Sequence, residues 1–418
     1  MAAPGPEKPL KQEATPPEDA TVIWNSRSMN YENLFWLACL VIGHTQLWVA
    51  LMNRLHALPL GHDRLRKIRL LHDAAIPLVP LWMLYALGLT GPQLVWYDRW
   101  REVSTGWWIF LALCAAGFAG FVFTHIRRFI EKVTANLLSV DAEVHDIAAD
   151  LGQKPIGSGP YQSLAWLPKN EQFQVELNIK RLLIPRLPRE LDQFSILHIS
   201  DLHMSGTVAR EYFAEVCRRA QALDADVVIF TGDLLDDMSA LDWFESTLNQ
   251  LSAPHGRYFI LGNHDDELDP ETIRRTMLDA GWIDVGGKTL NETWRGVPIE
   301  MGGSEVPWMG THPDWSCEKQ NRDTFRLFLT HTPDYYQWGI NHAADLILAG
   351  HNHGGQICLP LIGPVYSPAR TGTRYAGGTF SAGATVMHVS RGISGQHPLR
   401  YHCLPEVTKL VLCGSDKD

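Results

Sequence analysis

The sequence lacks the cysteine pattern of a disulfide-rich protein. Its seven cysteines are scattered, none belongs to a CxxC pair, and Cys39 and Cys114 lie in apolar stretches. Evenly spaced cysteines are typical of secreted disulfide frameworks. We therefore expect reduced thiols, which favours a protein that faces the cytoplasm.

Positive charge is also scarce. The 418 residues carry 36 lysines and arginines against 46 aspartates and glutamates, which gives a net charge of −10. General nucleic-acid binding needs a basic surface, so this class of function is not expected. Charged residues make up only 20% of the chain and tryptophans number 15. This composition is unusual for a wholly soluble protein, and the length predicts two to three domains.

Long uncharged runs are concentrated near the N-terminus, after a tail over residues 1–30 that we expect to be disordered. Each run has about 20 residues, enough to cross ~30 Å of hydrocarbon, and tryptophan or tyrosine stands near the ends. We expect a transmembrane region over residues 31–130 with spans at about 33–53, 74–97 and 106–126. Buried helices of a soluble domain stay an alternative, mainly for the second run, which contains two prolines.

Basic residues predict the orientation of these spans, because short cytoplasmic loops are rich in lysine and arginine. They follow the first and third runs: Arg54, Arg64, Arg66, Lys67, Arg69, Arg127, Arg128 and Lys132. We expect a multi-pass protein of the inner cell membrane, with its N-terminus outside and everything after residue 127 in the cytoplasm. The cluster at 64–69 could also bind anionic lipid headgroups.

The periodicity changes after the third run. Residues 131–170 are expected to form a helical linker, and residues 171–418 a separate domain. "QVELNIKRLLI" alternates like a β-strand, whereas "VAREYFAEVCRRAQAL" and "LDWFESTLNQL" have apolar residues on one helical face. Short apolar runs that alternate with such helices indicate α/β organisation.

Five apolar runs of this domain end in residues that bind metals or transfer protons. "FSILHIS" precedes Asp201 and His203, "DVVIFTG" precedes Asp233, and "RYFILG" precedes the Asn263–Asp265 segment. "FRLFLT" precedes His331, and "ADLILAG" precedes the pair His351 and His353. Ligands bind at the carboxyl ends of strands in open α/β sheets, so we expect these side chains to converge.

The residue types predict a pair of divalent cations. Two ions about 3.5–4 Å apart can hold the attacking and leaving oxygens of a displacement at phosphorus. They need a bridging carboxylate and a mixture of imidazole and oxygen ligands. Two ions, two aspartates and one hydroxide leave about one positive charge, which suits a phosphate anion. No cysteine accompanies these residues, which argues against a thiolate zinc site.

The ordered motifs "DLH", "GD", "GNHD", "H" and "GHNHGGQ" resemble those of the calcineurin-like metallophosphoesterase family. The resemblance covers roughly residues 175–413. The C-terminal segments "LPLIGPVYSPARTGTRYAGG" and "VSRGISGQHPLRYHCLPEVTKLVL" are similar to its bacterial membrane-associated branch. The resemblance implies a four-layer α/β/β/α sandwich around two mixed sheets, preceded by the transmembrane region.

The resemblance also implies a role for each motif residue. Asp201, His203 and His353 would hold one metal ion, and Asn263, His331 and His351 the other, with Asp233 bridging them. A metal-bridging hydroxide would attack phosphorus. His264 would stabilise the transition state or protonate the leaving group, and Asp265 would orient His264. The identity of the metals (Mn, Fe, Zn or similar) is left open.

The function expected from these features is that of a membrane-anchored two-metal phosphohydrolase, a phosphoesterase or phosphodiesterase that cleaves a phosphoester or pyrophosphate. Its membrane region suggests a lipid-linked phosphate, such as UDP-diacylglucosamine. Three alternatives stay open: a phosphodiesterase for a soluble nucleotide, a non-catalytic scaffold, and a transport or sensing protein with an accessory hydrolase domain. Spans without charged residues argue against the last.

Two further segments have alternative interpretations. Asp236 and Asp237 could support the site from outside, but acidic residues that start a helix or loop are the favoured reading. Residues 301–316 could face the substrate or pack on a sheet, and neither is favoured.

Overall fold

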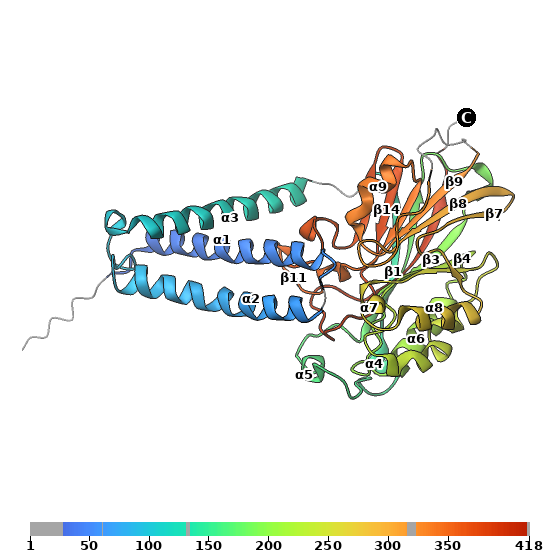
Figure 1. Cartoon of the computed structure of the whole chain (residues 1–418), viewed down its shortest axis with the longest axis horizontal. Helices are drawn as coiled ribbons and strands as arrows, with labels where there is room; N and C mark the ends of the chain where they lie inside the picture. The colour runs from blue at the N-terminus through green and yellow to red at the C-terminus, as the bar shows by residue number, and fades with distance from the viewer. Residues whose placement is uncertain (1–27, 61, 131–133, 316–322, 416–418) are drawn as a thin grey trace, which may run out of the picture.

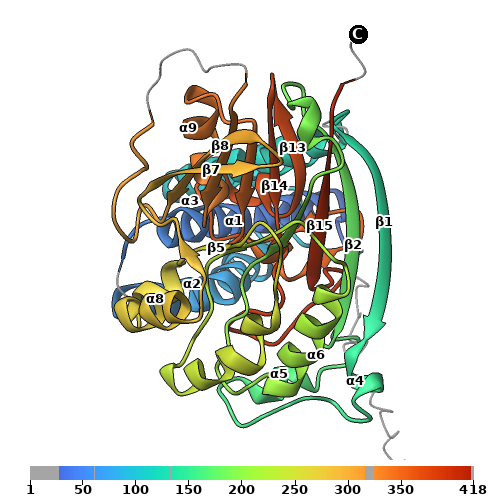
Figure 2. The ribbon, with the colours of Figure 1, turned by 90° about the vertical axis from the view of Figure 1, so that its right-hand side faces the viewer.

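The computed structural model of the protein describes residues 28–60, 62–130, 134–315 and 323–415. Most of the tail expected at residues 1–30 lies outside these ranges. Three long helices form a bundle that projects from an α/β domain (Figure 1). The α/β domain is built from two large sheets with helices on their outer faces (Figure 2).

Three helices are long and apolar enough to cross a membrane, namely Tyr31–His56, Lys67–Leu89 and Thr105–Arg128. They belong to α1 (Tyr31–His56), to α2 (His62–Met83) with its π-helical continuation η1 (Leu84–Leu89), and to α3 (Thr105–Ile130). A short 3₁₀ helix, η2 (Trp100–Glu102), lies before α3. Glycines allow α1 and α3 to pack closely, because a Cβ on Gly43 or Gly117 would collide with the backbone of the other helix.

The second apolar helix ends earlier than the span expected at 74–97. It stops at Leu89, before Gly91 and Pro92, and the chain then turns back. The backbone N–H groups of Leu94 and Val95 donate to the carbonyls of Leu87 and Gly88 at 2.9 and 3.2 Å. These bonds satisfy carbonyl groups that the helix end leaves free. The apolar stretch 90–97 therefore caps the C-terminal end of the second apolar helix. At its N-terminal end this helix begins earlier than predicted, with the first turns of α2.

The helical linker expected over residues 131–170 is wrong. The segment contains β1 (Leu137–Asp146), which pairs antiparallel with β2 (Gln174–Leu183). It has only two short helices, α4 (Ile147–Asp150) and α5 (Gln162–Ala165). Residues 137–146 form a strand instead of a helix because the edge of β2 offers them a full ladder of backbone hydrogen bonds. The α/β domain thus begins near residue 137 rather than 171.

The two large sheets are mixed, as expected. The first has the order β1-β2-β15-β3-β4-β5-β6 and the second β13-β14-β10-β9-β8-β7. The remaining strands of the first sheet are β15 (Glu406–Cys413), β3 (Ser195–Ile199), β4 (Val227–Thr231), β5 (Arg257–Ile260) and β6 (Ile283–Asp284). Those of the second are β13 (Gly378–Ala382), β14 (Thr385–Val389), β10 (Leu346–Ala349), β9 (Phe325–Thr330), β8 (Val297–Ser304) and β7 (Thr289–Trp294). A small hairpin pairs β11 (Cys358–Leu359) with β12 (Gly363–Pro364).

Helices cover the outer faces of these sheets. The α-helices are α6 (Arg210–Gln221), α7 (Asn263–Asp266), α8 (Pro270–Asp279) and α9 (Tyr336–Asn341). The short 3₁₀ helices are η3 (Arg189–Leu191), η4 (Met238–Ser246), η5 (Leu248–Gln250), η6 (Pro333–Tyr335), η7 (His353–Gly355) and η8 (Gly372–Tyr375). The face predicted in 208–220 is buried in α6, whereas "LDWFESTLNQL" forms the two 3₁₀ helices η4 and η5 instead of one α-helix.

Alternating side chains show the four layers. In β4, Val228 and Phe230 join the core beneath α6 and α8, whereas Val227 and Ile229 join a second core between the sheets. In β9, Leu327 and Leu329 enter that second core and Phe328 packs beneath α9. Successive strand residues point to opposite faces, so the central strands of each sheet are buried on both faces, whereas the edge strand β1 is largely exposed. The α/β/β/α sandwich is confirmed.

Candidate metal centre

The expected ligands converge at one edge of the sandwich. Two clusters of side chains each offer ligand atoms within 4.8 Å of one another: Asp201, His203, Asp233 and His353, and Asp233, His331 and His351. Asp233 belongs to both. The clusters form because β3, β4, β9 and β10 end side by side in parallel pairs or across the facing sheets. Asn263, which starts α7 after β5, joins the second cluster.

Short distances link the two clusters through Asp233. Its Oδ2 lies 3.4 Å from Nε2 of His203 and 3.1 Å from Nε2 of His331. Oδ1 of Asn263 lies 3.2 Å from the same nitrogen of His331. In the first cluster, Nε2 of His353 lies 3.7 Å from Oδ1 of Asp201. Asp233 therefore lies within reach of histidines of both clusters.

These residues fit a metal pair chemically. Nε2 of His203 and Oδ2 of Asp233 are buried and have no hydrogen-bond partner, a costly state for polar atoms. Ligands bound at about 2.1 Å in tetrahedral geometry lie about 3.4 Å from each other, close to the separations seen here. Divalent cations would satisfy both atoms.

The backbone is strained at most of the ligands. Positive φ angles occur at five of the seven: Asp201 (55°), His203 (50°), Asp233 (58°), His351 (70°) and His353 (49°). Such angles cost about 1–3 kcal/mol each for residues with a side chain and concentrate at functional sites. The strands thus end in sharp turns that aim each side chain at the centre.

The second ring nitrogen of each histidine is anchored by the protein. Nδ1 of His331 lies 2.7 Å from the Thr231 carbonyl, and Nδ1 of His353 lies 3.1 Å from that of Ser394. His351 is reversed, since its Nε2 lies 2.8 Å from the Pro368 carbonyl. Anchoring of this kind orients a ligand and fixes its tautomer. His331 and His353 thus present Nε2 to the centre, and His351 presents Nδ1.

Charge and burial set the protonation of these rings. Burial lowers the pKa of His351 and of His353 to about 3, so both are neutral and have a free lone pair. Burial would also lower the pKa of His331, but the Asp233 carboxylate outweighs it and raises that pKa to about 9. A cation beside Asp233 would compete with the proton on His331.

His264 lies beside the clusters with its side chain 23% exposed. Its Nδ1 lies 2.7 Å from Oδ1 of Asp236, which also lies 2.7 Å from Nδ1 of His203. Asp236 is therefore the partner that orients His264. The prediction that Asp236 only starts a helix or loop is wrong. Asp237 does start a helix, since its side chain accepts from Ser239 N at the beginning of η4.

Asp265 does not orient His264, contrary to expectation. It is fully buried, and its carboxylate accepts hydrogen bonds from four backbone N–H groups: Asp233 (2.9 Å), Leu234 (2.9 Å), Leu235 (3.2 Å) and Gly262 (2.9 Å). Asp265 follows His264 in the chain, but in the single turn of α7 their side chains point apart. Asp265 ties the loop after β4 to the loop after β5.

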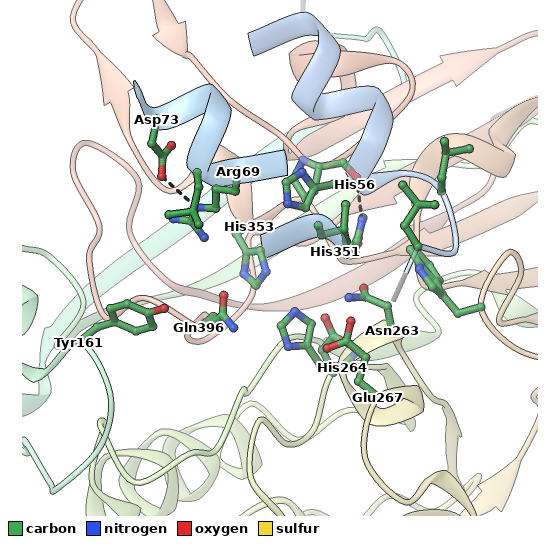
Figure 3. Close-up of a pocket in the computed structure, with 17 residues that line it drawn as sticks. His56, Arg69, Asp73, Tyr161, Asn263, His264, Glu267, His351, His353 and Gln396 are labelled. Atoms are coloured by element: carbon green, nitrogen blue, oxygen red, sulfur yellow. Dashed lines mark hydrogen bonds and ion pairs between the residues drawn. The ribbon is translucent and has the colours of Figure 1, made fainter. Parts of the chain in front are cut away.

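A cavity of about 360 Å³ opens over the metal ligands. Its lining includes Asn263, His264, His351 and His353 below and residues of α1 and α2 above (Figure 3). Trp308 also lines it, with its ring 4.9 Å from that of His351. The segment 301–316 is therefore divided: residues up to Ser304 belong to β8, Trp308 faces the site and Trp315 packs in the core beneath α9. Residue 316 lies outside the described residues.

Sequence reasoning missed the upper wall of this cavity. His56 ends α1, while Arg69 and Asp73 lie on α2, and all three line the cavity (Figure 3). No local motif marks them, because their place depends on how the helix bundle docks on the sandwich. The sequence signal available is the basic segment 64–69, for which the sequence predicts a topology signal or a lipid-headgroup contact but no place in the site.

Comparison with known proteins agrees with the geometry. The model of the calcineurin-like phosphoesterase family matches residues 194–355. The chain is 30% identical over 263 residues to the uncharacterized metallophosphoesterase YkuE of Bacillus subtilis, covering 61% of this chain and 90% of that protein. It is 30% identical to the phosphodiesterase YaeI of Escherichia coli, covering 52% and 82%. It is 22% identical to the UDP-2,3-diacylglucosamine pyrophosphatase LpxG of Chlamydia muridarum, covering 58% and 92%.

Proposed function

The chain belongs to the calcineurin-like phosphoesterase family of metal-dependent hydrolases, and from this premise we propose that it is a membrane-anchored phosphohydrolase with two divalent cations in one centre. One ion is held by Asp201, His203 and His353, and the other by Asn263, His331 and His351. Asp233 contributes to both. The identity of the ions depends on their availability, since imidazole and carboxylate ligands accept several first-row metals.

The observation that carries this proposal is the position of Asp233 between the two clusters. Its Oδ2 is buried, lacks a hydrogen-bond partner and lies near imidazole nitrogens of both clusters. The other oxygen of Asp233, Oδ1, accepts from the backbone N–H of His264 at 2.9 Å, so Oδ2 alone is left without a donor. Oδ2 lies near an imidazole of each cluster, which suits an oxygen that binds cations in both.

The residues around the centre divide the chemistry among them. Bound divalent cations would polarise the phosphoryl oxygens and lower the pKa of a water molecule toward neutrality. His264 is partly exposed to the cavity and is held by Asp236 at 2.7 Å. Burial would lower the pKa of His264, but Asp236 and Asp233 raise it above its ordinary value. His264 is therefore placed to donate a proton to the departing alkoxide or phosphate oxygen.

The substrate is a lipid-linked phosphoester or pyrophosphate, for which UDP-diacylglucosamine is the first candidate. Two observations support this choice. The cavity over the centre is walled by the ends of apolar helices, and one relative, of which the alignment covers 92%, is a UDP-2,3-diacylglucosamine pyrophosphatase. A soluble nucleotide diester is the second candidate, favoured by the relative that is a phosphodiesterase. A non-catalytic scaffold would have no need of His264 and Asp236 beside the ligands.

The catalytic domain faces the cytoplasm in this proposal. The end of α1, the basic first turns of α2 and the end of α3 lie at the same end of the bundle as the α/β domain (Figure 1). Positively charged segments favour the cytoplasmic side. A reporter that works only in the cytoplasm should be active when fused after residue 130, and a reporter that works only after export should be inactive there. Activity of an exported reporter at this position would reverse the orientation.

One assay tests the activity. The full-length protein, loaded with Mn²⁺, Zn²⁺, Ni²⁺ or Mg²⁺, is offered a p-nitrophenyl monoester, a p-nitrophenyl diester and UDP-diacylglucosamine. Asp233→Asn should abolish turnover and lower the bound metal, measured by elemental analysis, whereas Asp237→Asn should change neither. His264→Ala should keep the metal and lose about 10²–10⁴-fold in kcat. Full activity of Asp233→Asn would disprove the two-metal proposal.

A further inference from the structure

Four leucines stand in the wall of the cavity that the helix bundle supplies. Leu58 and Leu60 lie in the α1–α2 connection, and Leu65 and Leu70 lie on the first turns of α2. We call this set the leucine wall. It faces Asn263, His264 and His353 across the same cavity of about 360 Å³. Apolar side chains therefore stand directly opposite the catalytic groups.

The position of the leucine wall relates it to the membrane surface. Helix α1 has 26 residues, so it is about 39 Å long at 1.5 Å per residue. This exceeds a hydrocarbon core of about 30 Å, and the surplus lies beyond the hydrocarbon. The span in the second helix begins at Lys67, between Leu65 and Leu70. The cavity thus opens at the level of the lipid headgroups.

Two members of the leucine wall are not explained by packing within the protein. Leu70 is 67% exposed and Leu58 is 44% exposed, whereas the core of the bundle is formed by other residues, including Leu37, Leu87 and Leu111. Exposed apolar side chains that gather beside a site are typical of a binding surface. A polar phosphate ester alone would gain nothing from them.

Arg69 lines the same cavity as the leucine wall and lies near His353 (Figure 3). Its guanidinium lies 3.7 Å from the Asp73 carboxylate and 3.5 Å from Nε2 of His397. These contacts hold the arginine across the cavity, with its side chain 46% exposed. A guanidinium can contact a phosphate oxygen with more than one N–H group.

We infer that the leucine wall is a subsite for the alkyl chain of a membrane-resident phosphoester, and that Arg69 positions its phosphate over the metal centre. This inference rests on the proposed phosphohydrolase activity and adds the part of the substrate that is recognised. The alkyl chain of the substrate lies between the membrane lipids and the leucine wall, and its phosphate reaches the metal centre beside His264. The α1–α2 connection is thus a specificity element as well as an anchor.

Two esters of the same chemistry test the inference. Ethyl p-nitrophenyl phosphate and hexadecyl p-nitrophenyl phosphate differ only in their alkyl chain, and both release p-nitrophenol. The full-length protein is assayed in lipid nanodiscs of fixed composition. Each variant is compared with the wild type on each ester, so that partition of the long ester into lipid cancels.

The chain offers matched controls. Leu70→Ser should lower kcat/KM for the hexadecyl ester about tenfold more than for the ethyl ester, and Leu70→Met should restore the preference. Leu71→Ser removes a neighbouring leucine that is 62% exposed but does not line the cavity, and it should change neither value. Arg69→Gln should raise KM for both esters more than it lowers kcat, whereas Lys67→Gln should not.

The outcomes separate the two claims. If Leu70→Ser and Leu65→Ser lower kcat/KM equally for both esters, or for neither, the leucine wall does not bind the alkyl chain and the inference is overturned. Bound metal and melting temperature, compared with the wild type, identify variants that lost their fold. A wild-type protein that hydrolyses neither ester nor UDP-diacylglucosamine with any metal would overturn the proposed function itself, and the alkyl-chain subsite with it.

Discussion

The carboxylate of Asp236 lies 2.7 Å from Nδ1 of His264. The same oxygen lies equally close to His203, so one buried aspartate links the proposed proton donor to a proposed metal ligand. Burial would raise the pKa of Asp236, but the two histidines hold it well below its usual range. Asp236 is therefore an anion that both rings require.

Replacing Asp236 should impair catalysis without unfolding the protein. Asp236→Asn keeps the shape of the side chain but removes the charge that orients both rings. Loss of such a supporting partner typically costs 10–100-fold in activity or metal affinity, and we expect a loss of about that size in kcat and weaker metal binding. Asp237→Asn is the matched control, because Asp237 accepts from Ser239 N at the start of η4. Equal activity of both variants would show that Asp236 has no such role.

Replacing Asp265 should instead lower stability. Its carboxylate accepts four buried backbone N–H groups, and Asp265→Ala leaves them unpaired. Each unsatisfied buried group costs about 1–3 kcal/mol, so we expect a loss of at least about 3 kcal/mol. Chemical unfolding of the full-length protein measures it, with Asp266→Asn as the neighbouring control. A stable but inactive Asp265→Ala would restore the catalytic role first assigned to this residue.

The ligand set could be predicted because it is written in local motifs. Each proposed ligand follows an apolar run, and strands of one sheet end at a common edge, so the sequence alone indicates that Asp201 and Asp233 meet. His331 follows β9 of the second sheet and joins them because the two sheets pack face to face. The partners of His264 could not be predicted in this way. Asp265 is adjacent in the chain but turns away, whereas Asp236 comes from the loop after β4, 28 positions earlier, and only the packing of two loops brings it near.

The rest of the fold shows the same division. Periodicity identified β2, α6 and three apolar helices, because each is governed by its own residues. It failed for residues 137–146, whose strand depends on the free edge of β2, and for the end of the second apolar helix, which the turn at 90–97 caps. The cavity wall at Leu70 depends on docking of the bundle, which no local pattern reports.

A methyl group added at Gly262 should disrupt the metal centre. A Cβ there would collide with Oδ1 of Asp233 and come within 2.7 Å of Cε1 of His331. Gly262→Ala must therefore displace two proposed ligands, although its φ of −110° is open to alanine. We expect bound metal and turnover to fall by at least tenfold, measured by elemental analysis and the diester assay. Gly120→Ala, where a Cβ meets nothing within 4 Å and φ is not positive, should keep its metal. A fully loaded Gly262→Ala would contradict the ligand assignment at Asp233.

Glu406 should make the stability of the α/β domain depend on pH. This carboxylate is 1% exposed, lies 2.9 Å from Nη2 of Arg391 and 3.2 Å from Nζ of Lys180, and accepts from the backbone N–H of Arg391. Burial would raise the pKa of Glu406, but these cations outweigh it and hold the pKa well below its ordinary value.

A group whose folded pKa is depressed stabilises the fold above its unfolded pKa, which is about 4.3 for glutamate, and this stability is lost as the pH falls below that value. Glu406→Gln breaks a buried ion pair, which costs about 3–5 kcal/mol. We expect the difference in unfolding free energy between wild type and Glu406→Gln to be full at pH 6–7 and to shrink steadily below about pH 4. Any release of metal in acid affects both proteins alike, so the difference isolates Glu406. A difference that stays constant down to pH 3 would mean that its charge does not stabilise the fold.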